Sequence, residues 1–321
     1  MIYGVYAAKH NDSKVRRASQ SGGAFTAVSD WILDRGGVIY GCILDDRFRA
    51  VHIRAENKEQ RDRMRGSKYV QSALGNVFRM IRDDLAAGKK VMFTGTPCQV
   101  AGLKRFIGDK GDQLYCIDII CHGVPSPAVW AAYLDWQKKR ARSEIESANF
   151  RDKSFGWHSC FETINFRNGT KATSSVYANL FYAHQTVRPS CFRCAYKNIE
   201  RQGDLTIADC WGIEKADPEL DDNKGLSLIL VNSEKGKELF SDISADMTCK
   251  PEDIEDLMQP CLREQFPVPE DRDLFWQEFR KKSFVYIARK YADYGLGNKV
   301  RHFMKRVAYK LRKESGKIWK R

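Results

Sequence analysis

The chain has 321 residues, of which 43% are hydrophobic and 30% charged, a composition typical of a soluble globular protein. This length suits two modest domains or one large α/β domain, and no apolar run approaches the roughly 18 residues of a membrane span. Much of the net charge of +13 comes from residues 299–321, which carry ten basic side chains and one acidic; the rest carries 44 basic and 40 acidic. This nearly balanced body does not favour phosphate contacts, so we expect no nucleic-acid partner.

The ten cysteines indicate a reducing compartment, because the N-terminus shows no basic region followed by an apolar core. We therefore expect a cytoplasmic protein in which clustered thiols bind metal or take part in catalysis.

Strand and helix patterns alternate through the first half of the chain. Strands are predicted at 38–44, 51–55, 90–95 and 115–121, and helices at 73–85, 100–106 and 128–136. This alternation predicts an α/β fold with a largely parallel or mixed sheet and crossover helices. The loops after such strands form the ligand crevice.

The pattern changes near residue 144. Alternating strands flank an Asn168-Gly turn, and further strands are predicted at 205–208 and 226–231, so we expect an α+β second half. We divide the chain into an N-terminal α/β part (1–143), an α+β part with a Cys-x-x-Cys pair (144–290) and a basic amphipathic tail (291–321).

Four cysteines have the spacing of soft metal ligands. Cys98 and Cys121 each follow a predicted strand, and Cys191 and Cys194 form the Cys-x-x-Cys pair. Together they would complete a tetrahedral set for zinc or for an iron–sulfur cluster. Cys42, Cys116 and Cys160 lie in apolar or strand contexts and are predicted to be core residues.

Two enzymatic alternatives use Cys98 differently. The Pro-Cys-Gln triplet also occurs in cytosine-5 DNA methyltransferases, but a Gly-rich adenosylmethionine loop and a Glu-Asn-Val triplet are both missing. A Cys98–His122 nucleophile pair would leave the Cys-x-x-Cys pair unexplained. His122 is the one histidine in a promising loop.

Two other segments are candidates for cofactor contacts. Ser19-Gln-Ser-Gly-Gly opens into a predicted helix, whose free N–H groups can hold a phosphate or can simply be capped by serine. Asp209 and Trp211 lie near the end of a strand, where a carboxylate and an indole can meet a flavin or a cluster, or can simply be a turn-capping Asp and a buried Trp. Between them, Cys210 is a spare ligand or a core thiol.

Taken together, six motifs resemble the beta-subunit family of coenzyme F420-reducing hydrogenases and dehydrogenases. They are Ser-Gly-Gly at 21–23, Gly-Ser-Lys-Tyr at 66–69, Thr-Gly-Thr-Pro-Cys-Gln at 94–99, Cys-His-Gly-Val-Pro-Ser-Pro at 121–127, Cys-x-x-Cys at 191–194 and Gly-Asp-Leu-Thr-Ile-Ala-Asp-Cys-Trp-Gly at 203–212.

The resemblance implies an iron–sulfur flavoprotein that passes electrons between a [4Fe–4S] cluster and FAD. By this resemblance Cys98, Cys121, Cys191 and Cys194 would bind the cluster. The flavin contacts would come from Ser21, Gly22, Gly23, Lys68, Tyr69, Thr94, Gly95 and Thr96, and the catalytic candidates are His122 and Asp209. Expected partners are an electron-donor protein, such as a ferredoxin or a redox subunit, and a small-molecule or deazaflavin acceptor.

The chain departs from the family pattern at two points. We expect the Cys-x-x-Cys-x-x-Cys module that precedes Ser-Gly-Gly in many relatives to be missing or to lie on another polypeptide. Cys210 replaces the usual aromatic residue between Asp209 and Trp211. The alternative function is a zinc-stapled, non-enzymatic adaptor at a membrane surface, where residues 299–321 would make a peripheral contact.

Overall fold

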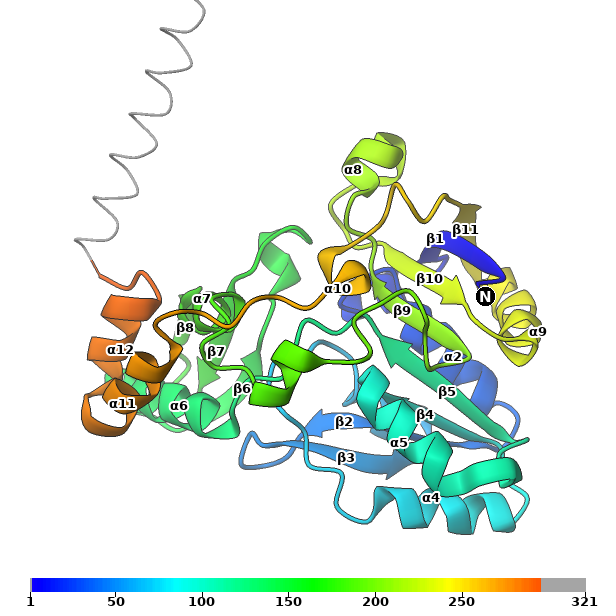
Figure 1. The fold of residues 1–321 in the computed structure, drawn as a ribbon, viewed down its shortest axis with the longest axis horizontal. Helices are drawn as coiled ribbons and strands as arrows, with labels where there is room; N and C mark the ends of the chain where they lie inside the picture. The colour runs from blue at the N-terminus through cyan, green and yellow to red at the C-terminus, as the bar shows by residue number, and fades with distance from the viewer. Residues whose placement is uncertain (1, 296–321) are drawn as a thin grey trace, which may run out of the picture.

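The computed structural model describes residues 2–295, and its centre is an eight-stranded mixed sheet (Figure 1). The strand order is β11-β1-β10-β9-β5-β4-β2-β3. The strands are β1 (Gly4–His10), β2 (Val38–Leu44), β3 (Ala50–Ala55), β4 (Val91–Gly95), β5 (Leu114–Ile119), β9 (Leu205–Asp209), β10 (Ser227–Val231) and β11 (Met247–Pro251). The four neighbours β2, β4, β5 and β9 run parallel, and the other pairs are antiparallel.

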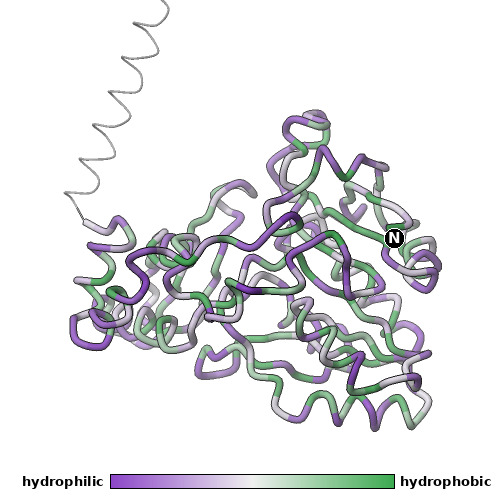
Figure 2. The backbone as a smooth tube through the Cα atoms, viewed as in Figure 1, coloured by the Kyte–Doolittle hydropathy of each residue, from purple (hydrophilic) through white to green (hydrophobic). Residues whose placement is uncertain are grey.

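Helices cover both faces of this sheet. On one face, α2 (Ala24–Leu33) and α9 (Glu234–Ile243) pack against residues such as Ile39 and Ile229; on the other, α4 (Val77–Ala86) and α5 (Pro97–Ile107) pack against Tyr40 and Phe93. All five residues of β10 are therefore buried, which explains the apolar run from residue 228 to residue 231. Hydrophobic residues follow the central strands in Figure 2.

A smaller antiparallel sheet lies beside the main one (Figure 1). It contains β6 (Ile145–Asn149), β7 (Glu162–Phe166) and β8 (Lys171–Ser174). Its aromatic-rich core includes Trp130 and Tyr133 of α6 and Phe275 of α11. Helices α6 (Pro127–Ala141), α7 (Val176–Tyr182), α11 (Arg272–Lys281) and α12 (Phe284–Tyr291) surround this sheet.

Short helices complete the described part of the chain. They are α1 (Ser13–Ala18), α3 (Lys58–Asp62), α8 (Ile213–Ala216), α10 (Pro260–Arg263) and the 3₁₀ turns η1 (Gly108–Lys110), η2 (Lys153–Phe155), η3 (Pro189–Arg193), η4 (Pro218–Leu220) and η5 (Ser244–Asp246). Within residues 2–295, no helix combines the length and apolar character needed to cross a membrane.

The predicted α/β class is confirmed, as are the mixed sheet and the hairpin at Asn168-Gly, where the N–H of Gly169 donates to the carbonyl of Phe166 at 2.9 Å. The strands β1 and β11 were not predicted from the sequence. It also did not foresee that β9, β10 and β11 return to the first sheet. The division at 143/144 stays a prediction, and the tail from residue 296 onward lies outside the described residues.

Candidate functional site

A cavity of about 630 Å³ opens at the carboxyl ends of the parallel strands. Residues 94–96 lie at the carboxyl end of β4, residues 119–122 at the carboxyl end of β5, and Asp209 ends β9. All of them line this cavity, which we name the main cavity. The position is the one expected for a ligand in an open α/β sheet. Its volume falls within the range of small-molecule and cofactor sites.

Most of the predicted flavin contacts meet in the main cavity. Seven of the eight line it: Ser21, Gly23, Lys68, Tyr69, Thr94, Gly95 and Thr96. Gly22 lies behind the wall instead, where a Cβ atom would approach the carbonyl oxygen of Ala8 to 2.1 Å. Gly22 therefore serves close backbone packing between the turn and β1.

The Ser-Gly-Gly turn presents backbone donors to the cavity. Gly23 is the N-cap of α2 with φ of 108°, a left-handed conformation that favours glycine. The N–H groups of Gly23, Ala24 and Phe25 find no acceptor among residues 2–295, and all three residues line the cavity. A helix start of this kind can bind a phosphate.

Lys153 stabilises the same turn from the small-sheet side. Its ammonium group donates hydrogen bonds to the carbonyls of Arg16, Ser19 and Ser21 at 2.9, 2.8 and 3.3 Å. Burial lowers the pKa of Lys153 to about 8. Nothing in the local sequence of Lys153 signalled this contact.

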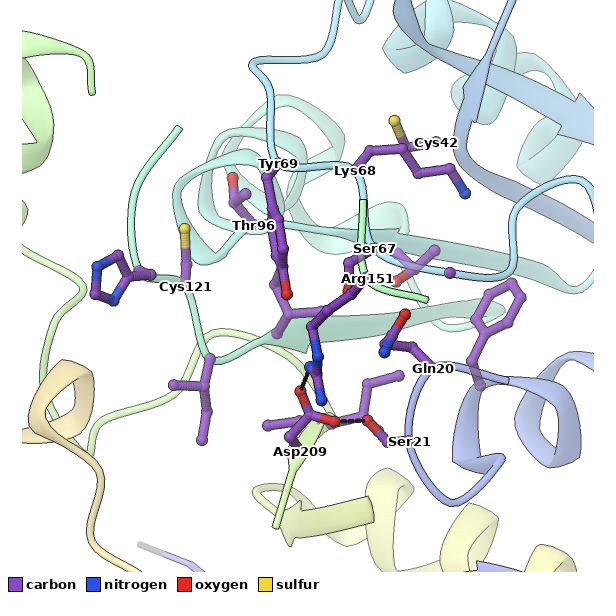
Figure 3. Close-up of a pocket in the computed structure, with 18 of the residues that line it drawn as sticks. Gln20, Ser21, Cys42, Ser67, Lys68, Tyr69, Thr96, Cys121, Arg151 and Asp209 are labelled. Atoms are coloured by element: carbon purple, nitrogen blue, oxygen red, sulfur yellow. Dashed lines mark hydrogen bonds and ion pairs between the residues drawn. The ribbon is translucent and has the colours of Figure 1, made fainter. Parts of the chain in front are cut away.

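Asp209 organises the floor of the cavity. Its carboxylate accepts a hydrogen bond from the hydroxyl of Ser21 and pairs with the guanidinium of Arg151 (Figure 3). It also accepts a hydrogen bond from the indole of Trp157 at 2.7 Å. The Arg151 side chain is 2% exposed. Because both carboxylate oxygens are engaged, Asp209 is arranged as a positioning residue, and its catalytic role stays a prediction.

Lys68 does not offer its ammonium group freely to a ligand. It donates to the carbonyls of Arg63, Met64 and Arg65, in the segment after α3, at 3.3, 2.8 and 2.8 Å. The neighbouring ring of Tyr69 stacks on Phe181 with centroids 5.0 Å apart.

Two buried polar atoms in the cavity wall have no partner among the described residues. They are Nδ1 of His52 and Nε2 of Gln20. His52 is 8% exposed, and its Nε2 lies 3.1 Å from the carbonyl oxygen of Thr94. A buried polar group without a partner is costly, so these atoms favour a polar ligand in the main cavity. The sequence pattern had marked His52 only as part of a strand.

The four predicted ligand cysteines gather next to the cavity. Cys121 lies in its wall, and the charges of Cys98, Cys191 and Cys194 act on its thiol. Burial first, and then these neighbouring charges, raise the pKa of Cys121 to about 12. A Cβ atom on Gly123 would lie 3.6 Å from that of Cys191, which places η3 against the loop after β5.

The sulfurs do not form a closed coordination shell in this structure. Among residues 2–295, no three His, Cys, Asp or Glu side chains stand close enough to hold a metal ion. The hydroxyl of Thr96 lies 3.1 Å from the Cys98 sulfur, and Cys98 is exposed. The side chains would therefore have to reorient to share one metal group.

The remaining cysteines divide between core and surface. Cys210 is fully buried in the apolar cluster with Leu228 and Ile213, which fits a core thiol. Cys116 is buried as predicted, but Cys42 is half-buried and lines the main cavity. Cys160 is exposed, so its prediction as a core residue was wrong.

His122 is surrounded by polar and aromatic neighbours that the sequence did not reveal. Its Nε2 lies 2.6 Å from Nε2 of His184, and its Nδ1 lies 3.5 Å from the sulfur of Cys261. Burial lowers the pKa of His122 to about 4. Cys261 also lines the main cavity, although its sequence context gave no reason to expect chemistry.

Fold and site together define an α/β protein with a cofactor-sized cavity beside a group of cysteines. The models of the coenzyme F420 hydrogenase/dehydrogenase beta subunit match its N-terminal part at residues 5–79 and its C-terminal part at residues 88–256. The chain belongs to this family, as the sequence motifs predicted, and the family implies a redox role.

A solved structure agrees at the level of the fold. It is a chain of the F420-reducing [NiFe] hydrogenase complex from Methanosarcina barkeri, with 17% identity and a TM-score of 0.56. The match covers 87% of this chain and 89% of that chain. A search of curated proteins found no match.

Proposed function

We propose that this chain is an iron–sulfur flavoprotein oxidoreductase that passes electrons between a [4Fe–4S] cluster and FAD, and on to an organic hydride acceptor or donor. The observation that carries the proposal is the position of Cys121. This residue lies in the wall of the main cavity, and the other three cysteines lie close enough to contribute to the raised pKa of its thiol. A cluster and a flavin held by these two groups of residues would be neighbours.

The residues of the main cavity fit a flavin dinucleotide. The N–H groups at the start of α2 suit its pyrophosphate, and the aromatic rings of Tyr69 and Phe181 suit a flat ring system. The unpartnered atoms of His52 and Gln20 offer polar contacts to ring or ribose. Arg151, Asp209 and Lys153 would hold the floor and the turn in place.

The cysteine group fits a cluster by its donor chemistry. All four residues of the group are cysteines and none is an aspartate or glutamate, which matches the thiolate ligation of iron–sulfur centres. When bound, the cluster would supply single-electron transfer and the flavin hydride transfer. The protein's part is to fix the distance between the two sites and to exclude water. The electron donor would be a ferredoxin-like protein or a redox subunit, and the cytoplasmic location stays a prediction.

Anaerobic purification with iron, acid-labile sulfide and flavin quantified tests the proposal. We expect about four iron atoms and one flavin per chain. Stoichiometric zinc with no iron would instead support the structural-zinc alternative and overturn the redox proposal.

A substitution tests the ligand assignment. Cys191→Ser should abolish the broad visible absorbance at about 400 nm that an iron–sulfur cluster gives to the purified protein, because one of the four thiolate ligands is lost. Cys249→Ser on β11 is the matched control and should keep this absorbance, since Cys249 has no contact with the group. An unchanged spectrum in Cys191→Ser would contradict the assignment.

A further inference from the structure

Lys197 is a buried cation that has no carboxylate partner. Four cationic residues are buried among residues 2–295. Lys197, which is 4% exposed, forms no ion pair with a carboxylate in this part of the chain. A buried charge is costly unless it is compensated, so Lys197 needs negative charge nearby. The other three buried cations do have carboxylate partners, in the pairs Arg16–Asp222, Arg61–Asp30 and Arg151–Asp209.

Two neutral contacts hold the ammonium group of Lys197 in place. It donates a hydrogen bond to the carbonyl of His122 at 3.2 Å, and its nitrogen lies 3.1 Å from the centre of the Phe266 ring. The Phe266 ring in turn stacks on the ring of His184, with centroids 3.7 Å apart. These contacts orient the ammonium group, but a carbonyl and an aromatic ring carry no net charge.

The same contacts place the positive charge of Lys197 beside the predicted ligand cysteines. His122 directly follows Cys121, and the backbone N–H of Lys197 donates to the carbonyl of Cys194 at 3.5 Å. Burial is the largest influence on Lys197 and lowers its pKa, whereas nearby thiols act in the opposite direction. These thiols belong to Cys261, Cys121, Cys194 and Cys191. Thiols are therefore the main groups that favour the positive charge of Lys197.

An iron–sulfur cluster would give Lys197 the negative charge that its protein contacts lack. A [4Fe–4S] core held by four thiolates is an anion, and each electron that it accepts adds one negative charge. A fixed positive charge nearby stabilises the reduced state of such a cluster more than its oxidised state, because the reduced state is more negative. Net charge is one of the factors that set the reduction potential of a cluster.

We propose that Lys197 is the counter-charge of the iron–sulfur cluster and that its ammonium group raises the reduction potential of the cluster. Lys197 would not ligate iron, and it acts only through its charge. It therefore makes entry of an electron from the donor protein more favourable. This inference rests on the proposed function, because it requires a cluster bound by the four predicted ligand cysteines.

A redox titration of the full-length, anaerobically purified protein, followed by electron paramagnetic resonance, measures the midpoint potential of the cluster. Lys197→Met removes the charge, and Lys197→Gln removes the charge but keeps a donor for the carbonyl of His122. Each should lower the equilibrium constant for one-electron reduction by at least about tenfold, which is about 59 mV. Lys197→Arg keeps the charge and should stay closer to the wild-type potential.

Lys235→Met is the matched control. Lys235 also donates to a backbone carbonyl, that of Leu114, and lies 5.2 Å from the centre of the Tyr115 ring. Leu114 begins β5, whereas Cys121 follows the other end of this strand. The charge of Lys235 is therefore remote from the cysteines, and Lys235→Met should leave the midpoint potential unchanged.

The signal reports only those molecules that hold a cluster, so partial loss of iron from a variant leaves the measured potential valid. Equal potentials in the wild type, Lys197→Met and Lys197→Gln would overturn the inference and leave the proposed function intact. A lower potential in Lys197→Met but not in Lys197→Gln would also overturn it, since the hydrogen bond rather than the charge would then set the potential.

The composition of the purified protein separates this inference from the proposed function. Protein that contains no iron would overturn both. If iron is present, flavin is absent and both neutral variants of Lys197 show the lowered potential, the proposed function fails and the role of Lys197 stands.

Discussion

At the scale of single residues, Asp209 shows how one carboxylate can organise a site when both of its oxygens already have protein partners. Its partners come from three separate segments: Ser21 before α2, Arg151 after β6, and Trp157 after η2. The indole of Trp157 also stacks on Trp211 with centroids 4.7 Å apart. Asp209 therefore ties the two sheets together at the floor of the main cavity.

Asp209→Asn should destabilise the protein by about 3 kcal/mol, because it leaves the buried charge of Arg151 without a partner. Urea unfolding of the apoprotein measures this free energy. The double variant with Arg151→Met should recover part of the loss, since the unpaired charge is then removed. If Asp209→Asn leaves stability unchanged, the carboxylate is not a positioning group.

At the scale of elements, Glu162 joins the small sheet to a helix. It lies on β7, is 1% exposed, and accepts hydrogen bonds from the N–H groups of Tyr177 at 2.9 Å and Ala178 at 3.3 Å, in the first turn of α7. Burial raises the pKa of Glu162 to about 7 from the ordinary value of 4.5. The folded protein thus holds this proton at a pH where the unfolded chain has released it.

This difference predicts that stability falls as the pH rises from about 4.5 to 7, by at most about 3 kcal/mol. The stabilising contribution of protonated Glu162 is fully present below pH 4.5. It is lost as the pH rises through the pKa of the folded state, about 7. In Glu162→Gln, the free energy of unfolding measured with urea between pH 5 and 8 should no longer show this pH dependence, because the amide does not titrate. Glu146→Gln, at an exposed position on β6, is the control and should keep the wild-type slope. A slope as steep in Glu162→Gln as in the wild type would contradict the assignment.

At the scale of the whole molecule, the main sheet is built from both ends of the described chain. Strand β1 forms its ladders with β10 and β11, and β5 pairs with β9 on one side. Helix α2 packs on α9 across the same face. Residues 1–143 thus contribute an incomplete sheet.

We expect a fragment of residues 1–143 to lack cooperative unfolding, because β1 has lost its partners and β5 exposes an open edge. Near-ultraviolet circular dichroism and urea titration of the fragment measure this. Cooperative unfolding in urea, together with a strong near-ultraviolet circular dichroism signal, would show instead that residues 1–143 are an independent domain.

The sequence predicted the local structure best where periodicity was strong. The buried strands β2, β4, β5 and β10, and the helices α5 and α6, were all indicated by their apolar patterns. Strand β1 was missed because Gly4–His10 mixes small, aromatic and basic residues and gains its partners only from distant strands. The site residues His52, Lys153 and His184 were missed for the same reason, since their contacts cross between elements.

The sequence alone determined the family, the α/β class and the candidate cysteines, because ordered motifs and local periodicity are written along the chain. Tertiary structure decided which residues meet. It brought seven predicted flavin contacts into one cavity, placed Gly22 behind its wall, and engaged Lys68 and Asp209 with protein partners. The physical reason is that hydrogen bonds, burial and net charge at a point depend on segments that are distant in sequence and adjacent only after folding.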